Sequence, residues 1–389
     1  MSRRFDFSVA EDIRTASTLP AWIYSDPEAF ARARERVFAP SWQLVGDTDR
    51  LRAPGQVCPH TLLEGCLDEP LLLTRDRNDQ LHCLSNVCTH RGNLVVESEG
   101  VEQQLRCRYH GRRFGLDGRF QSMPEFEGAV GFPSERDHLT TVAFGTWEKF
   151  VFASLAPAAP LENQLREMRA RCGWLPLGAA VFDPGRSRDY LVNANWALYC
   201  DNYLEGFHIA YVHAGLATAL DYASYRTELH PASSLQLGVA SGGESVFDLP
   251  KSSPDHGQRI AAYYWWLYPN TMFNFYPWGV SINVVKPLAV DRTRVSFLTY
   301  VWDDARLGHH HDQQARHRQL LRSPHQQDGA APAARGDREC RQVRHPGERV
   351  RRRPAGPGGS HPPRHHPRAH AHQHRAPSDP QEGRLRDPR

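Results

Sequence analysis

The sequence CTH at residues 88–90 is followed, sixteen residues later, by CRYH at residues 107–110. Each short segment supplies one thiol and one imidazole, Cys88 with His90 and Cys107 with His110. Thiolate and imidazole side chains are ligands that bind transition metals. The spacing therefore predicts a metal centre held between two loops, and this centre decides what kind of domain surrounds it.

Two kinds of metal centre can use two Cys and two His. In a Rieske [2Fe–2S] cluster, two Cys bind one iron and two His replace Cys on the other, which raises the reduction potential. A tetrahedral structural zinc site is the alternative, but zinc fingers usually group the Cys in one loop and the His in another. One Cys and one His from each loop therefore favours the Rieske cluster. The other cysteines show no pairing pattern and are expected to be reduced: Cys58, Cys66, Cys83, Cys172, Cys200 and Cys340.

Length and charge bound the class of protein. The 389 residues predict two or three domains, and the net charge of +3 is too small to indicate nucleic acid or a membrane as a partner. The N-terminus has no secretory signal pattern, and no stretch approaches the roughly 20 apolar residues of a membrane span. We therefore expect a soluble cytoplasmic protein.

The composition changes abruptly at residue 309. From His309 to Arg389 the chain contains no Phe, Tyr, Trp, Ile, Met or Lys, while 12 of its 21 His lie there. Such a segment cannot bury enough apolar surface to offset the entropy of ordering it, so residues 309–389 are expected to be a disordered low-complexity tail. Our hypothesis for its origin is a shift of reading frame just after Gly308 in a GC-rich gene. A genuine basic, His-rich tail is the alternative.

The pattern of short apolar runs predicts an all-β unit over residues 41–155, preceded by an N-terminal segment, residues 1–40. In the segment, Asp26 is expected to cap a helix that starts at Pro27 and runs to about Phe38. An Asp117-Gly118 turn predicts a hairpin between Phe114 and Phe120. Strands are expected at Leu71–Thr74, Gln80–Val87, Gln104–Arg108 and Trp147–Ser154.

The Pro/Ala-rich stretch Ala156–Pro160 marks a boundary, after which residues 156–308 form a second domain. Helices are expected at Glu162–Cys172 and within Ala194–Ala219. Strands rich in aromatic and β-branched residues follow, so helices covering an antiparallel sheet are the natural assembly and the fold class is α+β. These strands are Tyr263–Tyr268, Met272–Tyr276, Val280–Pro287 and Thr293–Trp302.

A second group of possible metal ligands lies in the expected long helix. Two imidazoles and a carboxylate, from His208, His213 and Glu205, are the ligand types of non-haem Fe(II) oxygenases. Glu205 and His208 are three residues apart and are expected to share a helix face. His208 and His213 lie roughly 140° apart around an ideal helix, so both can bind one iron only if the helix ends or distorts. Taken alone the pair is more often surface or core histidine, but its place after the first motif favours iron.

With both motifs in this order, the chain resembles the catalytic α subunits of Rieske non-haem iron oxygenases over about residues 17–307. Asn195-Trp196, leading into the helix, belongs to the same match. The resemblance implies a helix-grip-like mononuclear-iron catalytic domain at residues 156–308, on which the N-terminal segment packs. It implies that Cys88, His90, Cys107 and His110 bind the cluster and that His208 and His213 bind Fe(II).

Glu205 and Asn202 are the catalytic residues that the resemblance implies. Glu205 corresponds to the carboxylate that joins a cluster His of one subunit to an iron-ligand His of its neighbour, which goes with a head-to-tail homotrimer. Electrons would come from a separate NAD(P)H-dependent flavin or iron–sulfur reductase or a ferredoxin, because the chain lacks a nucleotide-binding glycine fingerprint. They would be passed to the iron, where O₂ and a small-molecule substrate react.

Glu at position 205, where the family usually has Asp, is similar to the branch that acts on quaternary ammonium compounds such as choline and carnitine. Two aromatic segments, 263–268 and 273–278, could hold such a head group by cation–π attraction, although core packing is the commoner role. One alternative is an aromatic-ring hydroxylating dioxygenase. Another, of a different class, is an electron-transfer or inactive protein without a complete iron site.

The resemblance breaks at the third iron ligand. Family members carry an Asp, or occasionally a Glu, on a helix about a hundred residues beyond the second His, which corresponds here to residues 315–330. Pro324 and Gly329 interrupt any helix in that window, and the nearby Asp312 and Asp328 lack the family context. We therefore expect an intact cluster site and an iron site that lacks one ligand.

Overall fold

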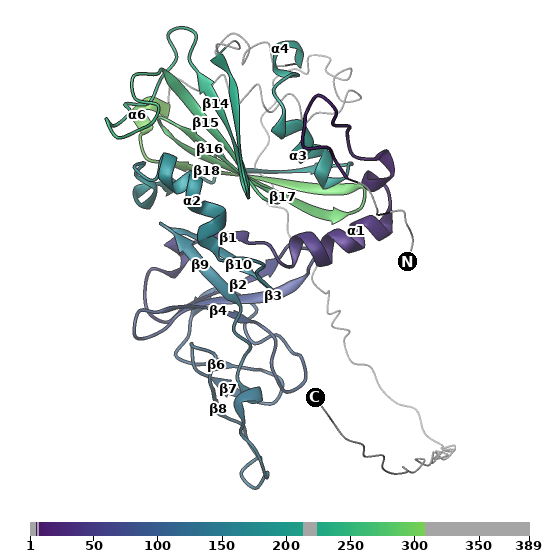
Figure 1. Ribbon diagram of the computed structural model, residues 1–389. Helices are drawn as coiled ribbons and strands as arrows, with labels where there is room; N and C mark the ends of the chain where they lie inside the picture. Colours follow the sequence, from purple (N-terminus) through teal and green to yellow (C-terminus); the bar gives the residue numbers. More distant parts are fainter. Residues whose placement is uncertain (1–4, 6–7, 213–223, 308–389) are drawn as a thin grey trace, which may run out of the picture. The chain divides into compact units, whose positions relative to one another are not determined.

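The architecture is α+β, as expected: a unit of small β-sheets is joined to one large sheet covered by helices (Figure 1). The computed structural model describes residue 5, residues 8–212 and residues 224–307. The expected iron ligand His213 and the expected tail from residue 309 onward lie outside the described residues.

The first β unit is built, within these residues, from three antiparallel sheets with the strand orders β1-β10-β9, β4-β3-β2-β5 and β6-β7-β8. Because β4 leads into Cys88 and β6 leads into Cys107, both predicted metal loops follow strand ends, as expected. The strands are β1 (Gln43–Asp47), β2 (Gln56–Leu62), β3 (Glu69–Arg75), β4 (Leu81–Ser85), β5 (Gly100–Val101), β6 (Leu105–Arg106), β7 (Arg113–Phe114), β8 (Phe120–Ser122), β9 (Ala143–Trp147) and β10 (Phe150–Ser154).

Two turns test the expected hairpins of this unit. The turn at Asp117-Gly118 is confirmed: Gly118 has a φ of 82° and joins β7 to β8. The single strand expected over residues 147–154 is wrong, because the chain reverses after Trp147 and Trp147 pairs with Phe150. Trp147 and the strand β10 are apolar and buried, so they look like one run. The turn between them is Glu148-Lys149, in which Glu148 has a φ of 51° and the Lys149 amine lies 2.6 Å from an Asp49 carboxylate oxygen.

The helices begin largely where capping residues predict. Asp26 accepts hydrogen bonds from the backbone of Glu28 (2.6 Å) and Ala29 (3.3 Å), which confirms it as the N-cap of α1. The helices are α1 (Pro27–Ala33), continued by a π-turn η3 (Arg34–Phe38), α2 (Leu161–Cys172), α3 (Trp196–Leu204), α4 (Ile209–Val212) and α6 (Asp304–Leu307), with the 3₁₀ turns η2 (Ala21–Tyr24), η4 (Thr48–Leu51), η5 (Glu135–Asp137) and η6 (Leu177–Ala179).

The large sheet is antiparallel and, in the described part of the chain, has eight strands in the order β11-β18-β17-β16-β15-β14-β13, with β12 also beside β18. Four of its strands lie close to the ranges expected from the sequence. The strands are β11 (Val181–Phe182), β12 (Arg188–Val192), β13 (Arg226–His230), β14 (Ser233–Val239), β15 (Ile260–Leu267), β16 (Thr271–Tyr276), β17 (Gly279–Ala289) and β18 (Arg292–Val301).

Alternation along β15 and β16 divides the aromatic segments between the two faces of the sheet. Trp265, Phe273 and Phe275 belong to the main core, together with α2 and residues of β10. The rings of Phe150 on β10 and Phe273 lie 5.7 Å apart, so the first β unit and the large sheet share one core. The intervening residues face α3, where Met272 packs on Cys200.

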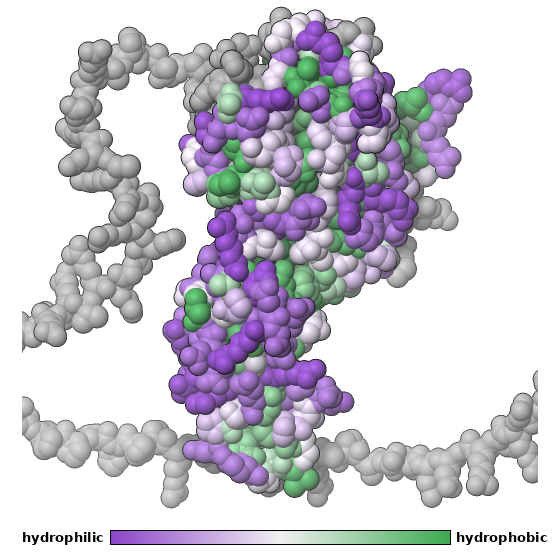
Figure 2. All heavy atoms as spheres, turned by 90° about the vertical axis from the view of Figure 1, so that its left-hand side faces the viewer, coloured by the Kyte–Doolittle hydropathy of each residue, from purple (hydrophilic) through white to green (hydrophobic). Residues whose placement is uncertain are grey.

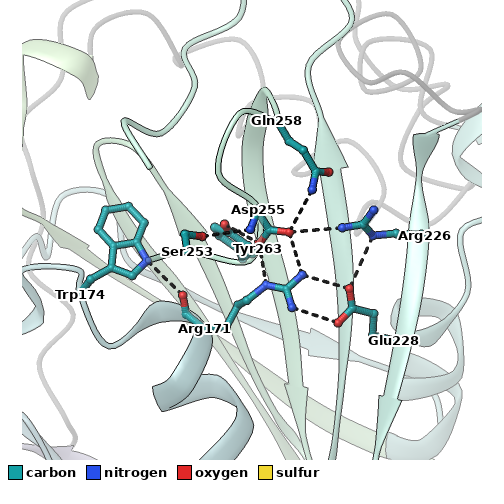
Figure 3. Close-up of polar contacts among 8 residues, drawn as sticks. All are labelled: Arg171, Trp174, Arg226, Glu228, Ser253, Asp255, Gln258 and Tyr263. Carbon is teal, nitrogen blue, oxygen red and sulfur yellow. Dashed lines mark hydrogen bonds and ion pairs between the residues drawn. The ribbon is translucent and has the colours of Figure 1, made fainter. Parts of the chain in front are cut away.

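A buried ionic network attaches α2 to the large sheet (Figure 3). The guanidinium of Arg171 on α2 lies 2.5 Å from Asp255, which is fully buried, and 3.0 Å from Glu228 on β13. Arg226 and the Tyr263 hydroxyl also contact Asp255. This network joins a helix, an edge strand and the loop between β14 and β15.

The surface is mostly polar on the side shown in Figure 2, with apolar residues gathered towards its lower end. None of the helices in the described ranges combines the length and the apolar character that crossing a bilayer requires.

Candidate metal sites

The two predicted cluster loops have the same backbone hydrogen bonds. In each loop the glycine four residues after the Cys donates its N–H to the Cys carbonyl at 3.0 Å, Gly92 to Cys88 and Gly111 to Cys107. Both glycines have a φ of 72°, a conformation that glycine adopts without steric cost. The Cys N–H in turn bonds the carbonyl five residues on, at 2.8 Å and 2.9 Å. The shared frame explains why a Gly follows each Cys/His pair.

The predicted ligands meet in like pairs. Cys88 and Cys107 are buried. Burial raises the pKa of the Cys88 thiol, and the neighbouring Cys107 thiol raises it as well. The imidazole rings of His90 and His110 lie 4.8 Å apart and nearly perpendicular, and His110 is exposed. The structure therefore brings together all four residues that the spacing singled out.

This pairing fits a two-iron cluster. In a Rieske centre one iron takes the sulfur pair and the other takes the imidazole pair, whereas a single tetrahedral ion needs all four ligands around one point. Across the described ranges, no three Cys, His, Asp or Glu side chains converge on a position for one ion. The donor set is thus arranged as two pairs, with the sulfur pair buried.

Asp137 ties the two loops together, a role that the sequence did not reveal. Its side chain pairs with the buried guanidinium of Arg112, and its carbonyl accepts a hydrogen bond from Thr89 at 2.9 Å. Burial is the largest single influence and raises the pKa of Asp137, but the hydrogen bonds from Ser134 and Arg112 and the charge of Arg112 together lower it overall. Arg112 also stacks 4.9 Å from the centre of the Phe120 ring.

The second predicted site lies where α3 ends. Glu205 has extended backbone angles (φ −119°, ψ 153°), and α4 begins only at Ile209. The expectation that one continuous helix places Glu205 and His208 on a shared face is therefore wrong. The helix breaks because Gly206 packs against the ring of Tyr225, where a Cβ would lie 2.8 Å from a ring carbon.

Glu205 and His208 are nevertheless in direct contact. One carboxylate oxygen of Glu205 bonds the Nδ1 of His208. The other accepts the backbone N–H groups of Phe207 (2.5 Å) and His208 (3.3 Å), which the break leaves without helical partners. Asn202 lies exposed on α3, and its neighbour Asp201 accepts a hydrogen bond from Tyr24 at 2.7 Å.

A cluster of tyrosines, from α3 and two sheet strands, accompanies this turn. Tyr203 lies in the last turn of α3, while Tyr264 and Tyr276 stand on β15 and β16 with their rings 6.1 Å apart. Burial raises the pKa of Tyr264 to about 12 and raises the pKa of Tyr203 and of Tyr276 well above the usual value, so these hydroxyls stay neutral. The sequence indicated Tyr264 and Tyr276 but not Tyr203.

Two family models match the chain. The Rieske [2Fe-2S] domain matches residues 41–133, and the catalytic domain of the ring hydroxylating alpha subunit matches residues 180–334. Choline monooxygenase of Arabidopsis thaliana is 28% identical over 307 residues, which cover 75% of this chain and 69% of the relative. The carnitine monooxygenase oxygenase subunit of Escherichia coli (strain K12) is 30% identical over 294 residues, which cover 74% and 76%.

The fold also matches a solved quaternary ammonium Rieske monooxygenase. The TM-score is 0.64 at 23% identity, over 79% of this chain and 82% of that one. The similarity covers the first β unit together with the large sheet, the parts that carry the two candidate sites.

Proposed function

Because the chain belongs to the Rieske non-haem iron oxygenases, as an oxygenase subunit whose cofactors are a [2Fe–2S] cluster and a mononuclear iron, we propose that it hydroxylates a small quaternary ammonium compound. Choline and carnitine monooxygenases are among its relatives. The observation that carries the proposal is the Glu205–His208 contact beside a half-buried tyrosine cluster.

The proposed ligands of the cluster are Cys88 and Cys107 for one iron and His90 and His110 for the other. His208 is the proposed ligand of the mononuclear iron, together with His213. When bound, the two centres supply electron transfer and O₂ activation.

The proposed task of Glu205 is to hold a proton on the Nδ1 of His208. A carboxylate that accepts this N–H fixes the tautomer and orients the ring, so that Nε2 is the nitrogen that would bind the metal. The backbone N–H groups of Phe207 and His208 hold the carboxylate in turn, so its position does not depend on the metal.

The tyrosine cluster supports a cationic substrate. A trimethylammonium group against a tyrosine face gains about 0.5–2 kcal/mol per favourable contact, and neutral hydroxyls leave the rings available for such contact. Four of the nine aromatic residues in the two segments lie in the main core instead: Tyr263, Trp265, Phe273 and Phe275. Recognition is therefore proposed for Tyr203, Tyr264 and Tyr276 only.

A head-to-tail homotrimer, served by a separate NAD(P)H-dependent reductase or ferredoxin, completes the proposal. The exposed His110 and the exposed Phe207 and Tyr211 beside the second site are the surfaces that a neighbouring subunit would cover. Closed rings are the usual result of such head-to-tail contacts.

The third iron ligand stays a hypothesis, because residues 315–330 lie outside the described ranges. We propose that the chain loads its cluster but holds Fe(II) weakly, since the window lacks a carboxylate in the family context. The other two reading frames of the gene after Gly308 test the frameshift. If neither encodes an amphipathic helix with acidic residues, the frameshift is refuted.

Iron analysis with a substrate panel tests the function. A complete oxygenase holds about three irons per chain and an electron carrier about two. With the matching reductase, and with Fe(II) added in excess because the chain is proposed to hold it weakly, trimethylammonium compounds should yield a product that carries one atom from ¹⁸O₂. Turnover of flat aromatic compounds, with both atoms incorporated, would favour the ring-hydroxylating alternative. If the cluster remains when all other iron is removed, and neither class of compound yields a product, electron transfer is the function that remains.

A further inference from the structure

The last turn of α3 is held on the large sheet through Tyr203. The hydroxyl of Tyr203 donates to Oδ1 of Asn274 on β16 (2.8 Å) and to the Trp265 carbonyl (3.3 Å). Its backbone carbonyl accepts a hydrogen bond from Nε2 of Gln236 on β14 (2.6 Å). Tyr203 is therefore fixed at both its side chain and its backbone.

Gln236 acts as a C-terminal cap of α3. The last four carbonyls of a helix have no partner within the helix, and the Tyr203 carbonyl is one of them. Here the donor comes from the sheet and not from the residues that follow the helix. The Tyr203 carbonyl therefore has a hydrogen-bond partner although the helix ends before Glu205.

Gln236 and Asn274 are themselves held in place. They are 2% and 5% exposed, and they pair with Tyr264 from its two sides in the sheet register. Oε1 of Gln236 accepts the hydroxyl of Tyr225 at 2.6 Å, and Nδ2 of Asn274 donates to the Ser281 carbonyl at 2.9 Å. Buried polar networks whose members are paired in this way are rigid.

The same network touches the turn that carries Glu205. Tyr203 precedes Glu205 by two residues, and the ring of Tyr225, which bonds Gln236, lies against Gly206. The turn therefore has Tyr203 fixed before it and Tyr225 fixed beside it. Movement of either would shift the Glu205 carboxylate relative to His208.

We propose that Gln236 and Asn274 are positioning residues for the Glu205–His208 pair. They hold Tyr203, and through it the end of α3, so that the turn at residues 205–208 stays in one conformation. The consequence for iron binding at His208 rests on the proposed function, whereas the positioning of the turn does not.

Hydrogen exchange of the full-length chain tests the positioning directly. In Gln236→Glu the new oxygen still accepts the Tyr225 hydroxyl, but the donor to the Tyr203 carbonyl is lost. In Asn274→Leu the nearer of the two acceptors of the Tyr203 hydroxyl is lost, and only the Trp265 carbonyl at 3.3 Å remains. In both variants the amides of Phe207 and His208 should exchange at least about fivefold faster. Tyr203→Phe, which removes one hydroxyl, is a milder variant that tests the same link if the others fold poorly.

Asn270→Leu is the matched control. Asn270 is fully buried in the turn between β15 and β16, and its Nδ2 donates to the Val285 carbonyl of β17 at 2.8 Å, but it makes no hydrogen bond to Tyr203 among those of the described residues. This control should destabilise the sheet as Asn274→Leu does, without faster exchange at residues 207–208. Equal exchange in the control and in the other variants would overturn the positioning.

Anaerobic Fe(II) titration, with cluster iron counted separately by its absorbance, tests the consequence. Gln236→Glu and Asn274→Leu should weaken binding about tenfold, as loss of support for a metal-ligating His does, while the control and the cluster absorbance stay unchanged. If the unaltered chain binds no iron beyond its cluster, the proposed function fails, and the exchange rates still decide the positioning. Unchanged Fe(II) affinity in both variants, with faster exchange, would refute the link from the turn to the metal.

Discussion

At the scale of single residues, two glycines with positive φ differ in the space around them. Gly92 (φ 72°) has nothing within 4 Å of a would-be Cβ, whereas at Gly118 (φ 82°) that atom would lie 2.9 Å from the Leu84 side chain. The left-handed conformation costs an L-residue about 1–2 kcal/mol. Gly92→Ala should lower the free energy of unfolding by about 1 kcal/mol, and Gly118→Ala by about 2–3 kcal/mol because Leu84 must also move. Denaturant unfolding followed by cluster absorbance measures both, and equal losses would contradict the argument.

Substitution of Glu205 should weaken the proposed mononuclear iron site and leave the proposed cluster site unchanged. Glu205→Ala removes the acceptor of the His208 Nδ1–H and of two backbone N–H groups. Fe(II) affinity is expected to fall about 10–100-fold, the usual effect of losing such an acceptor, while the cluster content stays the same. Metal analysis after gel filtration gives both quantities. Asp201→Ala on the neighbouring helix α3 is the control, and a similar loss of Fe(II) there would argue against a specific role for Glu205.

Residue identity alone was enough to single out the two Cys/His pairs that the structure brings together, because thiol and imidazole at a fixed spacing have few other uses. It was not enough to find Asp137 or Arg112. Their importance comes from meeting each other across 25 positions of sequence, which no local pattern reveals.

At the scale of elements, helix α2 depends on one buried guanidinium. Replacing Arg171 by Leu leaves Asp255, fully buried, and Glu228 without their main partner. Breaking a buried ion pair on one side typically costs about 3–5 kcal/mol, and Arg226 retains part of the contact, so a loss of about 2–4 kcal/mol is expected in denaturant unfolding. Glu162→Gln on the same helix, which breaks the exposed pair with Arg169, should cost less than about 1 kcal/mol. A smaller effect of Arg171→Leu than of this control would sink the interpretation.

Elements were predictable where local chemistry sets them. Asp26 and Pro27 start α1 as expected, because capping is a matter of neighbouring residues. The end of α3 was not predictable, since the apolar periodicity continues past Leu204. What stops the helix is Tyr225 against Gly206 and a carboxylate that takes over the free N–H groups, and both act after the chain has folded back on the sheet.

At the scale of the whole molecule, His60 should make stability depend on pH. Burial, and then the charges of Lys286 and Arg50, lower the pKa of His60 to about 4. In the unfolded chain the pKa is about 6.5. Between these values the unfolded chain binds a proton that the folded chain does not, so stability is lost as the pH falls through this window.

The expected size of this loss is about 2 kcal/mol between pH 6.5 and 4.5. His60→Gln should abolish that part of the decline and leave the rest, as urea unfolding at a series of pH values would show. Parallel curves for the two proteins would mean that His60 is not kept neutral by the fold.

The joining of the two folding units was beyond sequence reasoning. A strand such as β10 is apolar on both faces, which indicates burial but not what buries it. Its partner proved to be Phe273, more than a hundred residues away. Each unit was recognisable by itself, whereas their common core depends on shapes that form only in three dimensions.

The two predicted cluster loops have the same backbone hydrogen bonds, but the His residue stands at a different position after the Cys in each. His90 stands two residues after its Cys and His110 three residues after its own. Because the two His residues stand at different positions in matching turns, the two sides of the predicted centre differ in exposure. His90 is half-buried and His110 is exposed to solvent. In the proposed assembly, a partner protein would therefore meet the His110 side of the centre first, because His110 stands one position later in a loop of the same length.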